Sequence, residues 1–229
     1  MPQGRIHNDT GHGVAEGHYV KRRADLRYER KLWRSGLQAV AGVDEAGVGP
    51  MAGPVVAAAV IFAPETFIKG VHDSKQVPAP KREELYDLIR GRALAFAIGM
   101  AEVDEIDRLN IYHATLAACS RAVEGLCVKP EHVLIDGRPV RALTIPQTHI
   151  VGGDRKSFCI AAASIIAKVT RDRLMFEYDS RYPGYGFGRH KGYCTAEHFE
   201  AIGRLGPSPI HRRSFAPVSA AAQLSLSFL

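Results

Sequence analysis

Four acidic residues stand where predicted strands end. Asp44 and Glu45 follow the apolar run AVAGV, Asp136 closes HVLID, and Asp154 follows THIVGG. Ligands of open α/β sheets bind outside the ends of strands, so these carboxylates could converge on one site. Clustered carboxylates repel one another unless cations lie between them, and the hard ions Mg²⁺ and Mn²⁺ prefer oxygen ligands. Two such ions about 3.5–4 Å apart activate water and stabilise the leaving oxygen in phosphodiester hydrolysis.

Each carboxylate also has an ordinary structural explanation. Asp136 precedes Gly137 and could be a turn residue, while Asp154 could favour the N-terminus of the helix that follows it. Consecutive residues of a regular strand point to opposite faces, so Asp44 and Glu45 face one ion only if the strand loses its register. We expect the glycine-rich turn at 46–49 to permit that break. The joint pattern of three strand ends, rather than any single residue, favours a metal site.

The elements that must position these residues follow from hydrophobic periodicity. Short apolar runs predict strands at 39–43, 54–62, 94–103, 132–136 and 148–153. Helical patterns predict helices at 24–36, 79–93, 103–126, 157–182 and 195–206, and residues 183–193 are predicted to be loop. Strands dominate the first half and then alternate with helices, which favours an α/β fold with a mixed sheet and helices on both faces.

The same pattern divides the chain into three parts. Residues 1–36 form an N-terminal tail, with about the first 20 expected to be disordered, and a short helix. Residues 37–182 form the catalytic domain, and residues 183–229 form a helical and irregular C-terminal extension.

Composition narrows the class of protein. The 229 residues suffice for one compact domain with a real core, and the formal net charge of +6 favours a polyanionic partner such as nucleic acid. No run of about 18 apolar residues predicts a membrane span, and the N-terminus lacks the apolar core of a secretory signal. The four cysteines have no CxxC spacing and stand in surroundings that look like helix interiors. We therefore expect a reduced, cytoplasmic protein without disulfides or a cysteine-bound zinc.

Six motifs in order resemble bacterial ribonuclease HII. They are AGVDEAGVGPMAGPVVAAAVI, DSKQ, LIDG, GGDRKSFCIAAASIIAKVTRD, YGFGRHKGY and HRRSFAPV, and with their flanks they cover the chain from Leu32 to Val218. The resemblance implies a ribonuclease H-like fold, a mixed five-stranded sheet flanked by helices with a small C-terminal helical extension. It implies that Asp44, Glu45, Asp136 and Asp154 are catalytic and bind two Mn²⁺ or Mg²⁺ ions.

The implied reaction is hydrolysis of the RNA strand of RNA–DNA hybrids, and cleavage of duplex DNA on the 5′ side of an embedded ribonucleotide. It leaves 3′-hydroxyl and 5′-phosphate ends. To tell RNA from DNA, a protein must sense the 2′-hydroxyl, which both donates and accepts hydrogen bonds. The matching turn here is Gly47-Val48-Gly49, whose backbone can approach a ribose closely because glycine has no Cβ. Tyr193 matches the family tyrosine that packs on the adjoining sugar, although it could also be an aromatic at the edge of the core.

Basic residues near these motifs could contact phosphates. Lys75 suits such a contact, and the positions that would extend the basic surface are Lys168, Arg171, Arg189, His190 and Lys191. Each could equally be a solvated charge. Phosphate contacts carry no sequence information, so we expect binding that is sensitive to salt and indifferent to base sequence.

Position 48 departs from the family pattern, which usually has Arg or Lys between the two glycines. Val48 cannot pair with a phosphate, so we expect activity to survive with weakened binding. Because valine is β-branched, we also expect its φ to lie outside the positive region.

The C-terminal tail QLSLSFL (223–229) resembles peptides that dock on the bacterial sliding clamp, although it could be a terminal strand or a disordered end. We expect a monomer. Three other readings are a catalytically weak nucleic-acid-binding relative, a ribonuclease HIII and a phosphate-binding NTPase. The four carboxylates oppose the first, the few residues before the first predicted strand oppose the second, and the lack of GxxxxGK[ST] excludes the third.

Overall fold

A mixed five-stranded sheet forms the centre of the protein, and the computed structural model describes residues 24–216 and 218–220. The strands lie in the order β3-β2-β1-β4-β5. β1 pairs antiparallel with β2 and parallel with β4, while β2–β3 is antiparallel and β4–β5 is parallel. The strands are β1 (Val40–Ala46), β2 (Val55–Ile61), β3 (Ala95–Ala101), β4 (His132–Asp136) and β5 (Gln147–Ile150). The prediction of a mixed sheet is confirmed.

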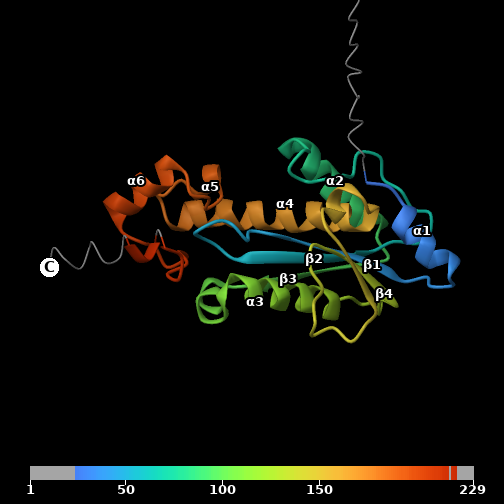
Figure 1. Cartoon of the computed structure of the whole chain (residues 1–229). Coiled ribbons are helices and arrows are strands. Elements are labelled where there is room, and N and C mark those ends of the chain that lie inside the picture. Colours follow the sequence, from blue (N-terminus) through green and yellow to red (C-terminus); the bar gives the residue numbers. More distant parts are fainter. Residues whose placement is uncertain (1–23, 217, 221–229) are drawn as a thin grey trace, which may run out of the picture.

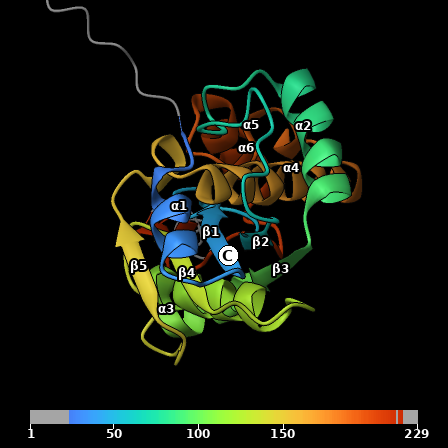
Figure 2. The same cartoon turned by 90° about the vertical axis from the view of Figure 1, so that its right-hand side faces the viewer.

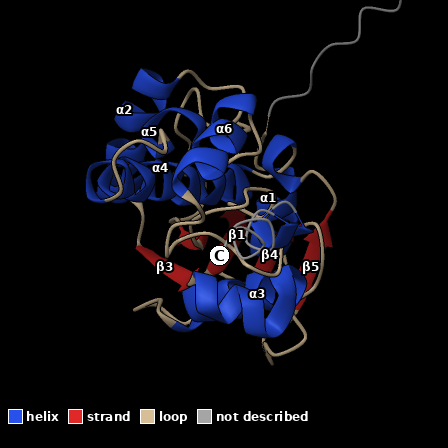
Figure 3. Ribbon diagram, turned by 90° about the vertical axis from the view of Figure 1, so that its left-hand side faces the viewer, coloured by secondary structure: helices blue, strands red, loops and turns tan. Residues whose placement is uncertain are grey.

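Helices cover both faces of this sheet. Figures 1 and 2 show α2 and α4 on one face and α3 on the other, with α5 and α6 beyond one end of the sheet. The helices are α1 (Arg27–Arg34), α2 (Ala79–Arg92), α3 (Val103–Glu124), α4 (Phe158–Arg181), α5 (Phe187–His190) and α6 (Ala196–Leu205), with a 3₁₀ turn η1 at Gly153–Arg155. Figure 3 shows the same layers from the side of α5 and α6, which form the small C-terminal helical extension.

Two apolar layers hold the sheet between the helices. One joins the sheet to α2 and α4, and includes Val60, Leu85 and Ile165. The other joins it to α3, and includes Ala57, Ile106 and Ala118. All seven residues of β2 are buried, as expected for a central strand covered on both faces, which reads as a continuous apolar run.

Several elements differ from the sequence prediction. The segment 183–193, predicted as loop, contains the single-turn helix α5. The helix predicted at 103–126 is kinked at Asn110, whose φ is 66°, and the Asn110 side chain accepts a hydrogen bond from the His113 N–H at 3.2 Å. The strand predicted at 148–153 ends at Ile150, because a turn leads from there into η1.

Only two of the four cysteines lie in helix interiors, as the sequence predicted for all of them. Cys119 and Cys159 are buried in α3 and α4, whereas Cys127 and Cys194 are exposed and lie outside the helices. The prediction of helix interiors is wrong for these two. Within the described ranges no helix is long and apolar enough to cross a membrane. The disorder predicted for the first 20 residues lies outside the described residues, and the boundaries of the three parts stay predictions.

A close approach between β1 and α4 depends on Gly42. A Cβ built on Gly42 would lie 2.1 Å from the carbonyl carbon of Cys159 and 2.4 Å from the N atom of Ile160. Both are backbone atoms, so no rotamer change could relieve the contact. The missing side chain therefore sets how closely the first turn of α4 packs on the strand that carries Asp44 and Glu45.

We expect Gly42→Ala to lower the free energy of unfolding by about 3 kcal/mol, because overpacking against backbone forces the layers apart. Gly203→Ala is the matched control, since its Cβ would meet nothing within 4 Å and alanine is about 1 kcal/mol better than glycine inside a helix. Urea unfolding of both variants measures the difference. Equal stability of the two would contradict the close approach.

Candidate active site

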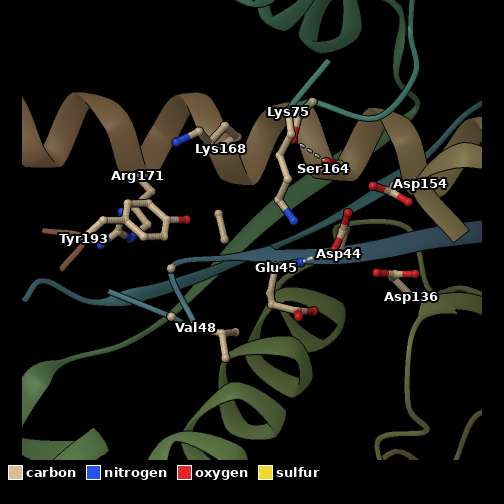
Figure 4. Close-up of a pocket in the computed structure, with 14 residues that line it drawn as sticks. Asp44, Glu45, Val48, Lys75, Asp136, Asp154, Ser164, Lys168, Arg171 and Tyr193 are labelled. Carbon is tan, nitrogen blue, oxygen red and sulfur yellow. Dashed lines mark hydrogen bonds between the residues drawn. The ribbon is translucent and has the colours of Figure 1, made fainter. Parts of the chain in front are cut away.

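One cleft of about 220 Å³ opens at the ends of β1 and β4. All eleven residues predicted for the site line it, together with Ala46, Ser74 and Ser164. Figure 4 shows the four carboxylates grouped at one end of the cleft, with Tyr193, Lys168 and Arg171 at the other. The sheet thus brings together residues more than a hundred positions apart, although their roles stay predictions.

The expected break in the first strand does not occur. β1 remains paired with β2 through Ala46, which faces Val56, so the strand is regular across Asp44 and Glu45. Figure 4 shows the two side chains directed to opposite sides of β1. The Asp44 Oδ1 accepts a hydrogen bond from the Glu45 N–H at 2.7 Å. The pair therefore lies at the rim of the sheet, one carboxylate on each face.

The other two carboxylates are tied to each other through the backbone. Val43 pairs with Ile135, so Asp136 comes next beside Asp44 in the parallel strands. The Asp136 Oδ1 accepts a hydrogen bond from the Gly153 N–H at 2.6 Å. Gly152 makes this turn possible with a φ of 64°, and the turn continues directly into Asp154 and α4.

Burial and mutual repulsion raise the pKa values of three of these carboxyl groups. Burial, Glu45 and Asp136 raise the pKa of Asp44 well above its usual range. The pKa of Glu45 is raised to about 7 by burial and by Asp136, with Lys75 acting against the shift. The pKa of Asp154 is raised to about 6 by burial, Asp73 and Asp136. Lys75, which acts against the shifts of Glu45 and Asp154, thus does not offset the negative charge of the carboxylates.

Sequence reasoning missed Asp73, a buried residue in the loop between β2 and α2. Its Oδ1 accepts a hydrogen bond from the Lys75 N–H at 3.0 Å, and its Oδ2 accepts one from the Gln76 Nε2 at 2.8 Å. Burial acts to raise its pKa, but these hydrogen bonds outweigh burial and lower it. Asp73 therefore fixes the loop that carries Lys75. The motif DSKQ was the only signal, because no strand ends at this position.

Two of the residues predicted to contact phosphates, Arg171 and His190, are buried. Arg171 is only 1% exposed, and its three guanidinium nitrogens donate to the backbone carbonyls of Pro54, Lys191 and Ala52 at 3.0 Å each. His190 is also buried, where its Nδ1 accepts from the Gly192 N–H at 3.1 Å. Neither residue is therefore a solvated charge, and a phosphate contact of either residue stays a prediction.

The remaining basic residues also have partners. Lys168 Nζ donates to Asp172 Oδ1 at 2.7 Å, and Arg189 pairs with Glu197. Lys191 Nζ lies 3.2 Å from the ring centroid of Phe176. Lys75 differs, because its charge acts on Glu45 and Asp154 within the cleft.

The carboxylate set suits hard divalent cations, since it offers only oxygen ligands and its charges destabilise one another. In the present arrangement, no three His, Cys, Asp or Glu side chains within residues 24–216 and 218–220 are close enough to hold one ion. The raised pKa values of Asp44, Glu45 and Asp154 support the fit, because a bound cation would offset the repulsion between the carboxylates and stabilise their charged forms.

Comparison with known proteins gives the family. The family model described as "Ribonuclease HII" matches residues 41–218. The chain belongs to the ribonuclease HII family. It is a ribonuclease H enzyme of the hydrolase class, as its relatives' names indicate. The "Ribonuclease HII" of Myxococcus xanthus (strain DK1622) is 52% identical over 96% of this chain and 75% of the relative. That of Anaeromyxobacter sp. (strain Fw109-5) is 56% identical over 87% of this chain, which spans 64% of the relative's length.

Solved structures share the fold. The ribonuclease H2 from Pyrococcus horikoshii OT3 is similar with a TM-score of 0.71 and 27% identity, over 81% of this chain and 98% of that one. The RNase HII of a PCNA:RNase HII complex from Archaeoglobus fulgidus has a TM-score of 0.66 and 26% identity, over 76% and 93%. Bst-RNase HIII in complex with Mn²⁺ has a TM-score of 0.65 at 19% identity, over 82% and 70%, and shows the ribonuclease H-like fold alone.

Asp136→Asn tests the repulsion within the cleft. Asn keeps an oxygen acceptor for the Gly153 N–H but removes one charge. Above pH 7, where Glu45 is ionised, we expect the metal-free variant to be more stable than wild type by about 1 kcal/mol. Adding Mg²⁺ should raise the melting temperature of the wild type and raise that of the variant much less.

Asp87→Asn is the control, because Asp87 is an exposed acid on α2 away from the cleft and should change stability by less than about 0.5 kcal/mol. Differential scanning fluorimetry with EDTA and with Mg²⁺ measures all three proteins. A metal-free Asp136→Asn protein less stable than the wild type would contradict the repulsion.

Proposed function

We propose that this chain is an endonuclease that hydrolyses the RNA strand of RNA–DNA hybrids and cuts duplex DNA on the 5′ side of an embedded ribonucleotide. The products would carry 3′-hydroxyl and 5′-phosphate ends, as needed for ribonucleotide removal from DNA. One observation carries the proposal: a single cleft holds the carboxylates of β1, β4 and η1 together with the Gly47–Gly49 turn and Tyr193.

The four carboxylates Asp44, Glu45, Asp136 and Asp154 would hold two divalent ions, Mg²⁺ or Mn²⁺. Ions bound there would activate water and offset charge on the phosphate. The chain's own contribution is to fix the carboxylates through the β1–β4 pairing and the Gly153–Asp136 hydrogen bond. Lys75 lines the same cleft, which supports a contact between its ammonium and a phosphate oxygen of the substrate.

The turn and Tyr193 would recognise the sugar together. A Cβ on Gly49 would lie 3.8 Å from the Tyr193 ring and touch nothing else within 4 Å. Tyr193 is 41% exposed, so one side of its ring is free to pack on a ribose or deoxyribose. Backbone groups of the turn can donate to and accept from a 2′-hydroxyl, and the missing Cβ lets them come close. Val48 has no positive φ, as expected.

A duplex with one ribonucleotide tests the proposed reaction. We expect the wild type with Mg²⁺ or Mn²⁺ to cut once, on the 5′ side of the ribonucleotide, and not to cut the matched all-DNA duplex. Asp136→Asn should be slower by more than about 100-fold, because changes around metal ligands already cost 10–100-fold. Extension by a polymerase and ligation identify the two ends. Equal rates of cleavage by the wild type and Asp136→Asn would contradict the mechanism. If neither protein cuts the duplex, the result would support a relative that has lost this chemistry.

A contact between the tail 223–229 and the bacterial sliding clamp is a second proposal. These residues lie outside the described ones. The similar Archaeoglobus fulgidus protein was solved in a PCNA:RNase HII complex, which supports a clamp partner for this chain. Leu226 and Phe228 would be the apolar anchors. The cytoplasm and a monomeric state stay our predictions for compartment and assembly.

We expect the full chain to retain the purified clamp in a pull-down, and Leu226→Ala and Phe228→Ala to weaken this retention by about tenfold or more, as loss of an apolar anchor does. Ser227→Ala is the matched control from the same tail and should bind like the wild type. Cleavage of free duplex should be unchanged in all of these variants. Retention that is equal in every variant would rule out this tail as the contact.

A further inference from the structure

A buried arginine of the C-terminal extension fastens the glycine turn from inside the protein. Arg212 is fully buried. Its Nη2 donates to the carbonyl oxygen of Gly47 at 2.5 Å, its Nη1 to that of Val48 at 3.0 Å, and its Nε to that of Gly53 at 2.9 Å. One planar side chain thus captures three carbonyls of the loop that follows β1, which is a geometry that the guanidinium fork provides and an ammonium does not.

Backbone pairing holds Arg212 in place. The Arg212 N–H donates to the Met51 carbonyl at 2.9 Å, and the Gly53 N–H donates to the Ile210 carbonyl at 2.8 Å. Ala52 and His211 form an antiparallel bridge between the two segments. The loop and residues 210–212 are therefore one unit, although they are about 160 positions apart in the chain.

The direction of these carbonyls determines which backbone groups of the turn point into the cleft. In a trans peptide the N–H points opposite to the C=O. Because the Gly47 and Val48 carbonyls point to Arg212, the N–H groups of Val48 and Gly49 point away from it. Both residues line the cleft, and neither N–H has an acceptor among the residues that the structure describes. Two free donors are thus presented toward the place where a ribose would lie.

Asp107 acts on the charge of Arg212 but does not outweigh its burial and the repulsion from Arg171. No carboxylate of the described residues forms an ion pair with Arg212 or with Arg171. Burial and the nearby Arg171 lower the pKa of Arg212 to about 9, which is the sign of an uncompensated buried cation. Backbone carbonyl oxygens accept hydrogen bonds from both guanidiniums and so stabilise their charges.

The same extension also holds Tyr193. The Ser208 N–H donates to His211 Nδ1 at 2.8 Å, so the proton of His211 is on Nε2. This Nε2–H donates to His198 Nε2 at 3.0 Å, which leaves the His198 Nδ1–H to donate to the Tyr193 carbonyl at 2.9 Å. His211 and Arg212 are adjacent, so one dipeptide anchors both elements that are placed to recognise the sugar.

We propose that Arg212 is a positioning residue that sets the preference for a ribonucleotide over a deoxyribonucleotide, by turning the Val48 and Gly49 N–H groups into the cleft. This inference rests on the proposed function. It assigns the specificity of the turn to a buried side chain outside the turn, in addition to the turn's own residues.

Binding in the absence of cleavage tests the proposal. In the Asp136→Asn background, the dissociation constants of a one-ribonucleotide duplex and the matched all-DNA duplex give a preference ratio. We expect Arg212→Lys, which keeps the charge but loses the fork, to lower this ratio by about tenfold, the scale of one or two misaligned hydrogen bonds. Affinity for the all-DNA duplex should stay within about twofold, because phosphate contacts are kept.

Arg213→Lys is the matched control. Arg213 is adjacent and exposed, and only its backbone N–H has a partner, the Asp107 carboxylate at 2.9 Å. The preference ratio of Arg213→Lys should equal that of the parent protein, Asp136→Asn. An unchanged ratio in a folded Arg212→Lys protein, as judged by thermal unfolding, would overturn the proposal. If the parent protein showed no preference for the ribonucleotide, that result would instead overturn the proposed function, so the two failures are distinct.

Amide hydrogen exchange in the parent protein supplies a test that needs no Arg212 variant. The Val48 and Gly49 amides should exchange without protection in the free protein and become protected with the one-ribonucleotide duplex, but not with the all-DNA duplex. Protection of both amides in the free protein would show that they have an internal acceptor, and would overturn the proposal even if Arg212→Lys does not fold.

Discussion

The repulsion among buried carboxylates at one edge of the sheet is the constraint on which the rest of the structure depends. Burial and neighbouring acids raise the pKa values of Asp44, Glu45 and Asp154, so the fold must hold them together against their own charge. It does so with rigid elements. β1 and β4 pair up to the site, and Gly42 lets α4 pack directly on β1. A site that cations complete must be stable without them, and packing of the two apolar layers provides that stability.

In the proposed function, the chemistry and the recognition of substrate come from two different parts of the molecule, which meet at the end of β1. The carboxylates belong to the sheet edge, whereas the extension after α4 supplies Tyr193 and Arg212. β1 ends at Ala46 and the turn begins with the next residue. A displacement of the turn therefore moves Glu45 as well, so the anchoring of the turn by Arg212 also constrains the carboxylates that we propose to bind metal.

Strand ends, the sheet and the order of elements could be predicted because they follow from local patterns. The apolar runs predicted β1 and β4, and the acids near the C-terminal ends of these strands lie in one cleft. Other features depend on tertiary pairing. β1 stays regular past Asp44 because β2 continues beside it, which no glycine count reveals. Asp73 was missed because it lies in a loop. Arg171 was read as a surface charge, since nothing in the sequence shows that folded carbonyls surround it.

A valine at position 48 is consistent with a turn whose peptide groups, held by Arg212, do the recognition in place of its side chains. The Val48 carbonyl is held by Arg212, and its side chain is 38% exposed. In the proposed function, the turn therefore recognises the ribose through its peptide groups, whose direction Arg212 sets. The side chain at position 48 contributes little to that recognition. A basic residue there would add a phosphate contact and strengthen binding to any nucleic acid duplex. Without a basic residue at position 48, binding to any nucleic acid duplex is expected to be weaker. The N–H groups that we propose to distinguish RNA from DNA stay in place.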